Sequence, residues 1–234
     1  MSKVFFDTNL LIAFVFLINS FHDASEKVFK EYQEYFYSSF VQEEFERRFG
    51  KKQLNLKKFY HDFKMSLKNS NKELYSIDDL KKFANHHYSG NLLGDAKNSV
   101  NSFWKEYVGI ESQISFVKMR NAIEFSLKDI SITSNSSKDY LDNIMQLTPE
   151  RVKSYSAIEK MLESEGVGPA DRTVTLDGHD FACNSFQPVD FVTFDVDCYN
   201  GAKNVGMLCF SSIKGKDDFK SSWTLIFCQN MPIF

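Results

Sequence analysis

The chain opens with a short apolar run, a polar cluster and then a longer apolar run. Val4 to Phe6 contains β-branched and aromatic residues, which favours a buried strand. Leu10 to Ile18 is longer and rich in Leu, Ala and Phe, which favours a helix. Asp7, Thr8 and Asn9 lie between the two runs and offer side chains that cap helix N-termini. The pattern therefore predicts a strand, a polar turn and a buried helix.

Two more strand-like runs have acidic residues beside them. Ligands of open α/β sheets bind at the carboxyl ends of the strands, so acids at these ends are candidates to meet. A carboxylate cluster that is fully charged and desolvated is unstable. Such a cluster must bind cations, be partly protonated or remain hydrated. The candidates are Asp7 after the first strand, Glu43 and Glu44 after Tyr35–Ser38, Asp195 and Asp197 after Asp190–Thr193, and Asp177 and Asp180 at the start of a short predicted helix before that last strand.

The long middle of the chain, residues 50 to 168, is mainly helical in pattern and carries no motif that identifies an activity. One helix is predicted before this segment, at about Val41–Phe49. Within the segment, helices are predicted at Asn55–Ser70, from Ser76, across residues 95–130 and at Ser154–Glu165. Thr133–Lys138 is typical of a linker because it is rich in Ser and Asn. Two further strands are predicted near the end, at Val205–Ser211 and Trp223–Cys228.

Length and composition fit a globular protein with an ample core. The 234 residues include 24 Phe and 10 Tyr, whereas Gly and Pro are scarce, which predicts few turns and much helix. The net charge of −3 counts against a protein that simply coats nucleic acid. Between Glu46 and Gly90, however, eleven Lys or Arg residues face five Asp or Glu residues. A basic segment apart from the acids is what a nuclease needs to hold a phosphate backbone.

The cysteines and the apolar stretches indicate in which cellular compartment the protein is expected. The four cysteines form no Cys-x-x-Cys pair, so neither a disulfide framework nor a zinc site is expected, and a reducing, cytoplasmic location is predicted. Asp7 and Asn9 interrupt the apolar opening, which is read as strand plus helix and not as an export signal. No stretch reaches the roughly 18 apolar residues of a membrane helix, so no membrane partner is expected.

Taken together, four segments resemble the PIN domain family of metal-dependent nucleases. They are V-F-F-D-T-N at the start, S-S-F-V-Q-E-E-F after the second strand, D-x-x-D-x-A-C near residue 180, and F-V-T-F-D-V-D at the last acids. The resemblance covers about residues 1–50 and 174–210. It implies a three-layer α/β sandwich with a mainly parallel sheet, here carrying a large helical insertion. The implied nuclease core is residues 1–50 and 170–234, and residues 51–169 would be the insertion, which grips substrate or forms a dimer.

The resemblance also assigns roles to individual residues. The four main acids match Asp7, Glu44, Asp177 and Asp195, with Glu43 as the competitor of Glu44 and Asp180 as the competitor of Asp177. With Asp180 and Asp197 nearby, these acids are expected to bind Mg²⁺ or Mn²⁺, because hard oxygen ligands suit those ions. Thr8, Asn9 and Thr193 are expected to hold the ligands and waters in place. The bases expected to contact nucleic acid are Arg47, Arg48, Lys51, Lys52, Lys57 and Lys58.

The expected activity is hydrolysis of RNA, single-stranded or structured, by a metal-dependent endoribonuclease. Two alternatives stay open: a non-catalytic scaffold of the same fold that binds RNA or protein, and a toxin held by an antitoxin-like protein. A homodimer is also possible within this family. A phosphatase that uses Asp195-Val196-Asp197 as its nucleophile loop is disfavoured, because only 37 residues follow Asp197.

Overall fold

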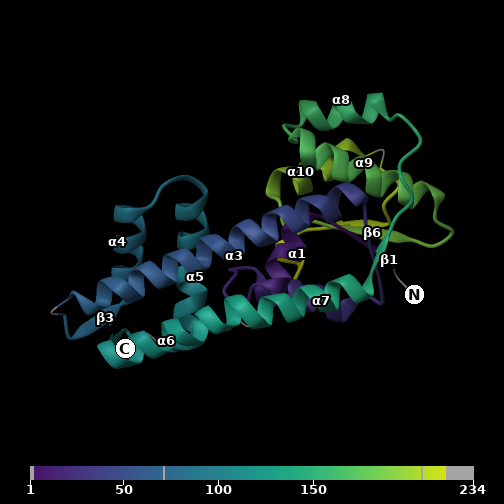
Figure 1. Ribbon diagram of the computed structural model, residues 1–234. Coiled ribbons are helices and arrows are strands. Elements are labelled where there is room, and N and C mark those ends of the chain that lie inside the picture. The colour runs from purple at the N-terminus through teal and green to yellow at the C-terminus, as the bar shows by residue number, and fades with distance from the viewer. Residues whose placement is uncertain (1–2, 71, 207, 220–234) are drawn as a thin grey trace, which may run out of the picture.

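The computed structural model describes residues 3–70, 72–206 and 208–219. Its centre is a five-stranded sheet with the order β5-β2-β1-β6-β7, in which every neighbouring pair is parallel (Figure 1). The strands are β1 (Lys3–Phe6), β2 (Glu34–Tyr37), β5 (Met145–Leu147), β6 (Val189–Val192) and β7 (Ser212–Lys214). The predicted α/β class with a mainly parallel sheet is confirmed.

Alternating side chains of β1 face helices on opposite sides of the sheet. Phe5 contacts Phe181 of α9 (Pro169–Asn184), whereas Phe6 contacts Phe29 of α2 (His22–Glu31). This period of two is what a strand buried on both faces produces. Helices α8 (Ser156–Ser164) and α10 (Val196–Val205) pack with α9, while α1 (Thr8–Val15) packs with α2. Helices therefore cover both faces, and β1 lies at the centre of the core.

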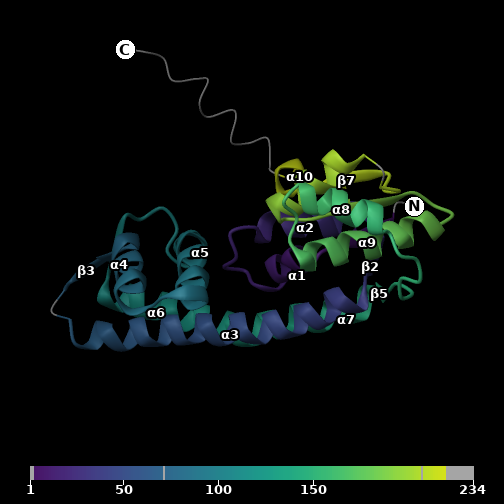
Figure 2. The same cartoon turned by 90° about the horizontal axis from the view of Figure 1, so that it is seen from above.

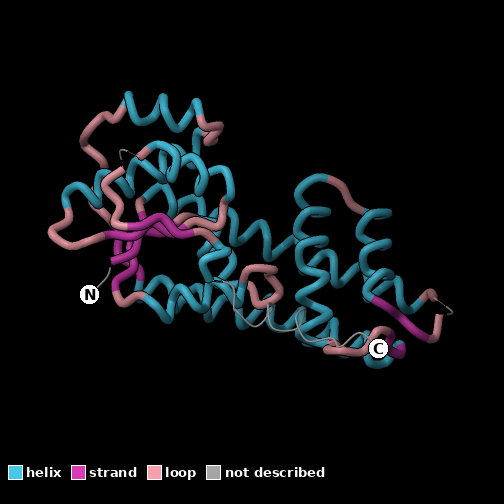
Figure 3. Tube along the Cα trace, turned by 180° about the vertical axis from the view of Figure 1, so that it is seen from behind, coloured by secondary structure: helices cyan, strands magenta, loops and turns pink. Residues whose placement is uncertain are grey.

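Between β2 and β5 the chain runs out from the sheet and back along two legs (Figures 1 and 2). The outward leg is α3 (Ser39–Lys68), one continuous helix of 30 residues. The return leg is α6 (Phe116–Lys128), a π-helical turn η1 (Asp129–Thr133) and α7 (Ser134–Ile144). Helices α4 (Ile77–His87) and α5 (Gly90–Tyr107) complete the arm, which also holds a two-stranded antiparallel sheet of β3 (Leu74–Ser76) and β4 (Gln113–Ser115). The Cα trace seen from behind shows the arm standing clear of the central sheet (Figure 3).

The arm differs from its sequence pattern in two places. Thr133–Lys138, predicted as a linker, is helical, because Ile130 and Leu141 on either side are buried in the core and draw the segment into one packed leg. Residues 145–147, inside the predicted insertion 51–169, form β5 and pair with β2. The central sheet thus takes an edge strand from within that segment.

The end of the described chain also differs from the prediction. The predicted strand Val205–Ser211 is wrong: α10 runs through Val205 and ends at Gly206 in a left-handed conformation with φ of 64°. The last strand is β7, and η2 (Lys216–Phe219) follows it. The predicted strand Trp223–Cys228 lies outside the described residues. Within the described ranges, no helix combines the length and the apolar character needed to cross a bilayer.

Two glycines give a paired test of this packing. A Cβ on Gly201 of α10 would lie 2.1 Å from Val167 Cγ2, whereas a Cβ on Gly50 in the middle of α3 would meet no atom within 4 Å. Gly201→Ala should therefore lower the free energy of unfolding by about 1–3 kcal/mol through overpacking. Gly50→Ala should raise it by about 0.5–1 kcal/mol, because alanine loses less backbone entropy in a helix. Urea unfolding of both variants measures the two signs, and a gain for Gly201→Ala would contradict the packing of α10 against the α8–α9 turn.

Candidate active site

Asp7 lies directly after β1 and caps the N-terminus of α1. Its Oδ1 accepts a hydrogen bond of 3.0 Å from the backbone N–H of Leu10, and its side chain is buried. The hydroxyl of Thr193, which follows the neighbouring strand β6, donates to Asp7 Oδ2. The sheet therefore fixes this carboxylate from two adjacent strand ends, as the sequence predicts for Asp7 and Thr193.

The electrostatics of Asp7 are unusual for a capping residue. The pKa of Asp7 is raised to about 7, mainly by burial and also by the charges of Asp171 and Asp195, against the lowering effect of the hydrogen bonds from Thr193 and Leu10. A group with this pKa is about half protonated at neutral pH. Strongly shifted acids of this kind are enriched at functional sites.

Glu44 reaches the same edge of the sheet from the second turn of α3. Ser38 caps that helix, its hydroxyl accepting from the Val41 N–H at 3.4 Å. Thr8 Oγ1 donates to Glu44 Oε2 at 2.6 Å. Glu44 is part-buried, whereas Glu43 points to solvent. Of the two competing acids, the structure brings Glu44 to the strand ends.

Two arginines balance the charge of Glu44. Arg48 Nη1 lies 3.6 Å and Arg47 Nη2 lies 3.9 Å from Glu44 Oε1. Arg48 also donates from Nη2 to Asn9 Oδ1 at 2.8 Å. Arg48 therefore lies among the carboxylates, and Asn9 helps to hold it there.

Asp195 follows β6 and caps α10. Its Oδ1 accepts from the backbone N–H groups of Asp197 and Cys198, each at 3.0 Å, and its own N–H donates to Thr193 Oγ1 at 3.1 Å. Asp197 is exposed in the first turn of α10. Thr193 thus contacts both Asp7 and Asp195, which links the acids of two strand ends.

A further acid at this edge is Asp171, which was not among the predicted acids. Asp171 lies in the first turn of α9. Its pKa is raised to about 6, mainly by burial and also by the charges of Asp195, Glu44 and Asp197, while Arg48 lowers it. Asp171 also raises the pKa of Asp7. These mutual effects place Asp171 among the acids at the strand ends.

Asp177 and Asp180 lie farther along α9 and have other partners. Asp177 Oδ1 accepts from Arg151 Nε at 3.0 Å, and Asp180 Oδ1 accepts from the Tyr155 hydroxyl at 2.6 Å. Burial keeps the pKa of Asp177 above its ordinary value, although the Ser38 hydroxyl and Arg151 stabilise the charged form. Arg151 and Tyr155, the partners of Asp177 and Asp180, form no hydrogen bond with the acids at the strand ends among the described residues.

A sequence signal for Asp171 existed. In Gly168-Pro169-Ala170-Asp171, Pro169 takes the first helical position and Asp171 falls in the first turn. Proline at this position and acids in the first turn both mark helix N-termini. Asp171 was not among the predicted acids because the helix was predicted to start at Asp177, whereas α9 starts at Pro169.

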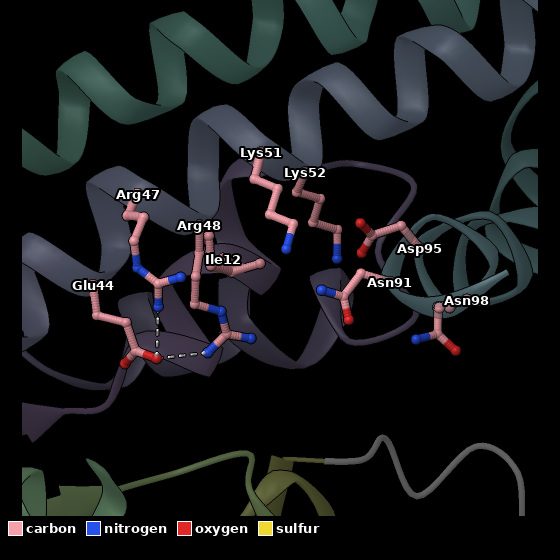
Figure 4. Close-up of a pocket in the computed structure, with 11 residues that line it drawn as sticks. Ile12, Glu44, Arg47, Arg48, Lys51, Lys52, Asn91, Asp95 and Asn98 are labelled. Atoms are coloured by element: carbon pink, nitrogen blue, oxygen red, sulfur yellow. Dashed lines mark ion pairs between the residues drawn. The ribbon is translucent and has the colours of Figure 1, made fainter.

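Next to Glu44, a cavity of about 400 Å³ opens between α3 and α5. We call it the α3–α5 cleft. Figure 4 shows the basic side chains of α3 directed towards it, with polar side chains of α5 opposite. Of the six predicted nucleic-acid contacts, Arg47, Arg48, Lys51 and Lys52 line the cleft. Lys57 and Lys58 do not: their ammonium groups contact Gln53 at 3.2 Å and Asp62 at 3.0 Å.

A second cluster lies at the other end of α9. Cys183 and Cys209 form a disulfide, contrary to the expectation that the cysteines do not pair, because the fold brings the end of α9 beside the segment before β7. His179 Nδ1 accepts from the Cys209 N–H at 2.9 Å, and burial lowers the pKa of His179. In the neutral imidazole the proton then lies on Nε2. Neither ring nitrogen of His179 is therefore free to bind a metal ion, and the two sulfurs are bonded to each other. Cys198 is free and buried.

The donors at the strand ends are all oxygens, the ligand type that suits Mg²⁺ and Mn²⁺. Among the described residues, only His179, Cys183 and Cys209 place three ligand atoms within 4.8 Å of one another. The carboxylate oxygens at the strand ends are therefore farther apart than the ligands of a bound metal ion would be. Repulsion between like charges favours this wider spacing. Comparisons of this chain with protein-family models, with curated proteins and with solved structures find no match.

Proposed function

We propose that this chain is a metal-dependent nuclease of the PIN type that hydrolyses phosphodiester bonds in RNA. The observation that carries the proposal is the meeting of Asp7, Glu44, Asp171 and Asp195 at one edge of a parallel sheet, where two of them have strongly raised pKa values. Charged carboxylates gathered at one edge of the sheet destabilise the fold unless a cation compensates their charge. A basic cleft beside them supplies what a phosphate backbone requires.

The chain's own residues have separable tasks in this proposal. Thr193 and Thr8 hold Asp7 and Glu44 by hydrogen bonds and so fix their oxygens. Arg48 compensates the charges of Glu44 and Asp171, and in this proposal it contacts a phosphate oxygen of the substrate. One carboxylate of the site would accept a proton from the attacking water or orient that water.

Asp7, Glu44, Asp171 and Asp195 are the residues that would hold Mg²⁺ or Mn²⁺. Such an ion, when bound, supplies an activated water and neutralises charge on the phosphate oxygens. Asp197 lies close enough to raise the pKa of Asp171 and could add a ligand through water. The antitoxin-like partner, the homodimer and the cytoplasmic location stay predictions.

Neighbouring glutamates on α3 provide a matched test. Glu44→Gln should lower the rate of Mn²⁺-dependent RNA cleavage by about 100-fold or more, because a neutral amide replaces one carboxylate of the site. Glu43→Gln should leave the rate within about twofold of wild type, since Glu43 is exposed on the same helix. Labelled single-stranded RNA, structured RNA and single-stranded DNA are incubated with Mn²⁺, Mg²⁺ or EDTA, and the products are resolved on gels.

The outcomes separate the proposal from its alternatives. Cleavage that EDTA and Glu44→Gln both suppress supports the nuclease. Binding of RNA without cleavage in any metal would overturn it in favour of the non-catalytic scaffold. Equal loss in both glutamate variants would indicate general damage to α3, and circular dichroism distinguishes that case from a specific effect.

A further inference from the structure

The α3–α5 cleft begins at the acids and ends in the arm. Glu44, which belongs to the acidic edge, is one of its lining residues, and Ile12 of α1 is another. Helix α3 supplies the basic wall. The opposite wall comes from the first three turns of α5, through Asn91, Asp95 and Asn98 (Figure 4). The cleft therefore joins the candidate active site to a helix that lies outside the segments resembling the PIN family.

The charges in the cleft are unbalanced in favour of cations. Four basic side chains of α3 face two carboxylates, Glu44 and Asp95. Both acids already have partners: Glu44 contacts Thr8 and two arginines, and Asp95 accepts from Asn55 Nδ2 at 2.7 Å. The basic wall is therefore only partly compensated from within the chain.

Lys51 and Lys52 carry the uncompensated charge. Within the described part of the chain, neither ammonium has a carboxylate within ion-pair distance. Lys51 is exposed to solvent. Lys52 is part-buried with its Nζ 5.7 Å from the centre of the Phe16 ring, and burial lowers the pKa of Lys52. The charge of Asp95 acts on Lys52 from beyond ion-pair distance. A partly desolvated ammonium gains more from an incoming anion than an exposed one does.

The α5 wall is open and rich in hydrogen-bond donors. A Cβ added at Gly90 or Gly94 would meet no atom within 4 Å, so nothing fills the space in front of these positions. The carboxamide of Asn91 lies near Lys52 across the cleft, beside Asp95, and Asn98 lines the cleft farther along α5. Cations on one wall and amide donors on the other suit a chain of phosphates and sugars.

We propose that the α3–α5 cleft binds the phosphodiester backbone of single-stranded RNA and leads the strand from the acidic edge into the arm. This inference rests on the proposed nuclease function and assigns substrate binding to α5. A cavity of about 400 Å³ lies in the range of small-ligand pockets and has room for roughly one nucleotide of a strand. Because Glu44 lines the cleft, a strand bound there reaches the acidic edge.

The test compares two pairs of neighbouring lysines that carry the same charge. Lys51→Gln/Lys52→Gln changes the cleft, whereas Lys81→Gln/Lys82→Gln removes the same charge from α4, away from it. Binding of a fluorescent single-stranded RNA is measured in EDTA at several salt concentrations. The cleft variant should bind about tenfold more weakly, and the slope of log affinity against log salt should fall in magnitude by about 1.4, as expected for two lost phosphate contacts on a single strand. The α4 variant should stay within about twofold of wild type.

Further arms of the experiment separate the possible failures. Unchanged RNA binding in the cleft variant, or equal weakening in both variants, would overturn the inference. Equal affinity for duplex and single-stranded RNA would also overturn it, as would complete competition by inorganic phosphate at millimolar concentration. If wild type binds RNA through the cleft but cuts none with Mn²⁺, the proposed function fails and the binding site stands. If wild type cuts RNA and the cleft variant cuts with an unchanged KM, the cleft inference alone fails. Thermal melting of each variant confirms that it folds.

Discussion

Asp171→Asn should abolish both Mn²⁺ binding and RNA cleavage, with a fall in cleavage rate of roughly 10²- to 10³-fold. Asp171 lies at the N-terminus of α9, and its pKa responds to Asp195, Glu44 and Asp197. The substitution removes one charge from the centre of this cluster while keeping the shape of the side chain. Calorimetric titration with Mn²⁺ and the gel assay measure the two effects.

Asp177→Asn on the same helix is the matched control. Asp177 forms an ion pair with Arg151 at 3.0 Å, so its replacement should leave Mn²⁺ affinity unchanged. Titration with Mn²⁺ measures the affinity, and thermal melting confirms that the variant folds. If Asp177→Asn abolished Mn²⁺ binding and Asp171→Asn did not, the acid expected from the sequence would be the ligand and the site described here would be wrong.

Asp7→Asn should stabilise the metal-free protein at high pH even though it removes a residue of the active site. The folded-state pKa of Asp7 is about 7, above the ordinary value of 3.8, so the folded state binds this proton more tightly than the unfolded state does. The stability that the folded protein gains from binding this proton at Asp7 is fully present below pH 3.8, and it is lost as the pH rises to about 7. Above pH 7 the wild-type protein carries a penalty on the order of 4 kcal/mol that the neutral amide avoids.

Urea unfolding in EDTA at pH 5 and pH 8 measures this effect. The advantage of Asp7→Asn over wild type should be large at pH 8 and small at pH 5. Asp23→Asn, measured at pH 3 as well, provides a control of opposite sign, because the hydrogen bond from Lys105 lowers the pKa of Asp23, and the loss of this carboxylate should cost more at pH 8 than at pH 3. A variant of Asp7 that is less stable than wild type by the same amount at both pH values would show that Asp7 is only a helix cap.

The sequence predicts the parts of the fold that depend on local pattern. The runs Val4–Phe6, Tyr35–Ser38 and Asp190–Thr193 correspond to β1, β2 and β6, because short apolar runs that end in polar residues have few other ways to fold. Since parallel strands share an edge, acids after those strands could be expected to meet. Asp7, Glu44 and Asp195 do meet there.

What the sequence did not predict depends on tertiary packing and on helix boundaries. Gly50 does not interrupt α3, because the buried residues Phe49 and Leu56 hold the helix on both sides of it. The strand β5 has only three residues, so its pattern is too short to detect before β2 is known to lie beside it. Asp171 was missed because the helix it starts was placed later in the chain. The disulfide joins residues 26 positions apart that only the folded chain brings together.

The central position of β1 has a consequence for how the chain is made. β1 pairs on one side with β2, which follows it closely, and on the other with β6, which begins only at Val189. At roughly 5–20 residues per second, a ribosome needs about 8–30 s to synthesise the stretch between β2 and β6. During that interval the arm can fold from local contacts, while one edge of the most apolar strand waits without its neighbour. Unpaired strand edges are sites of aggregation, so we expect ribosome-bound chains that stop before residue 189 to bind chaperones more strongly than longer ones.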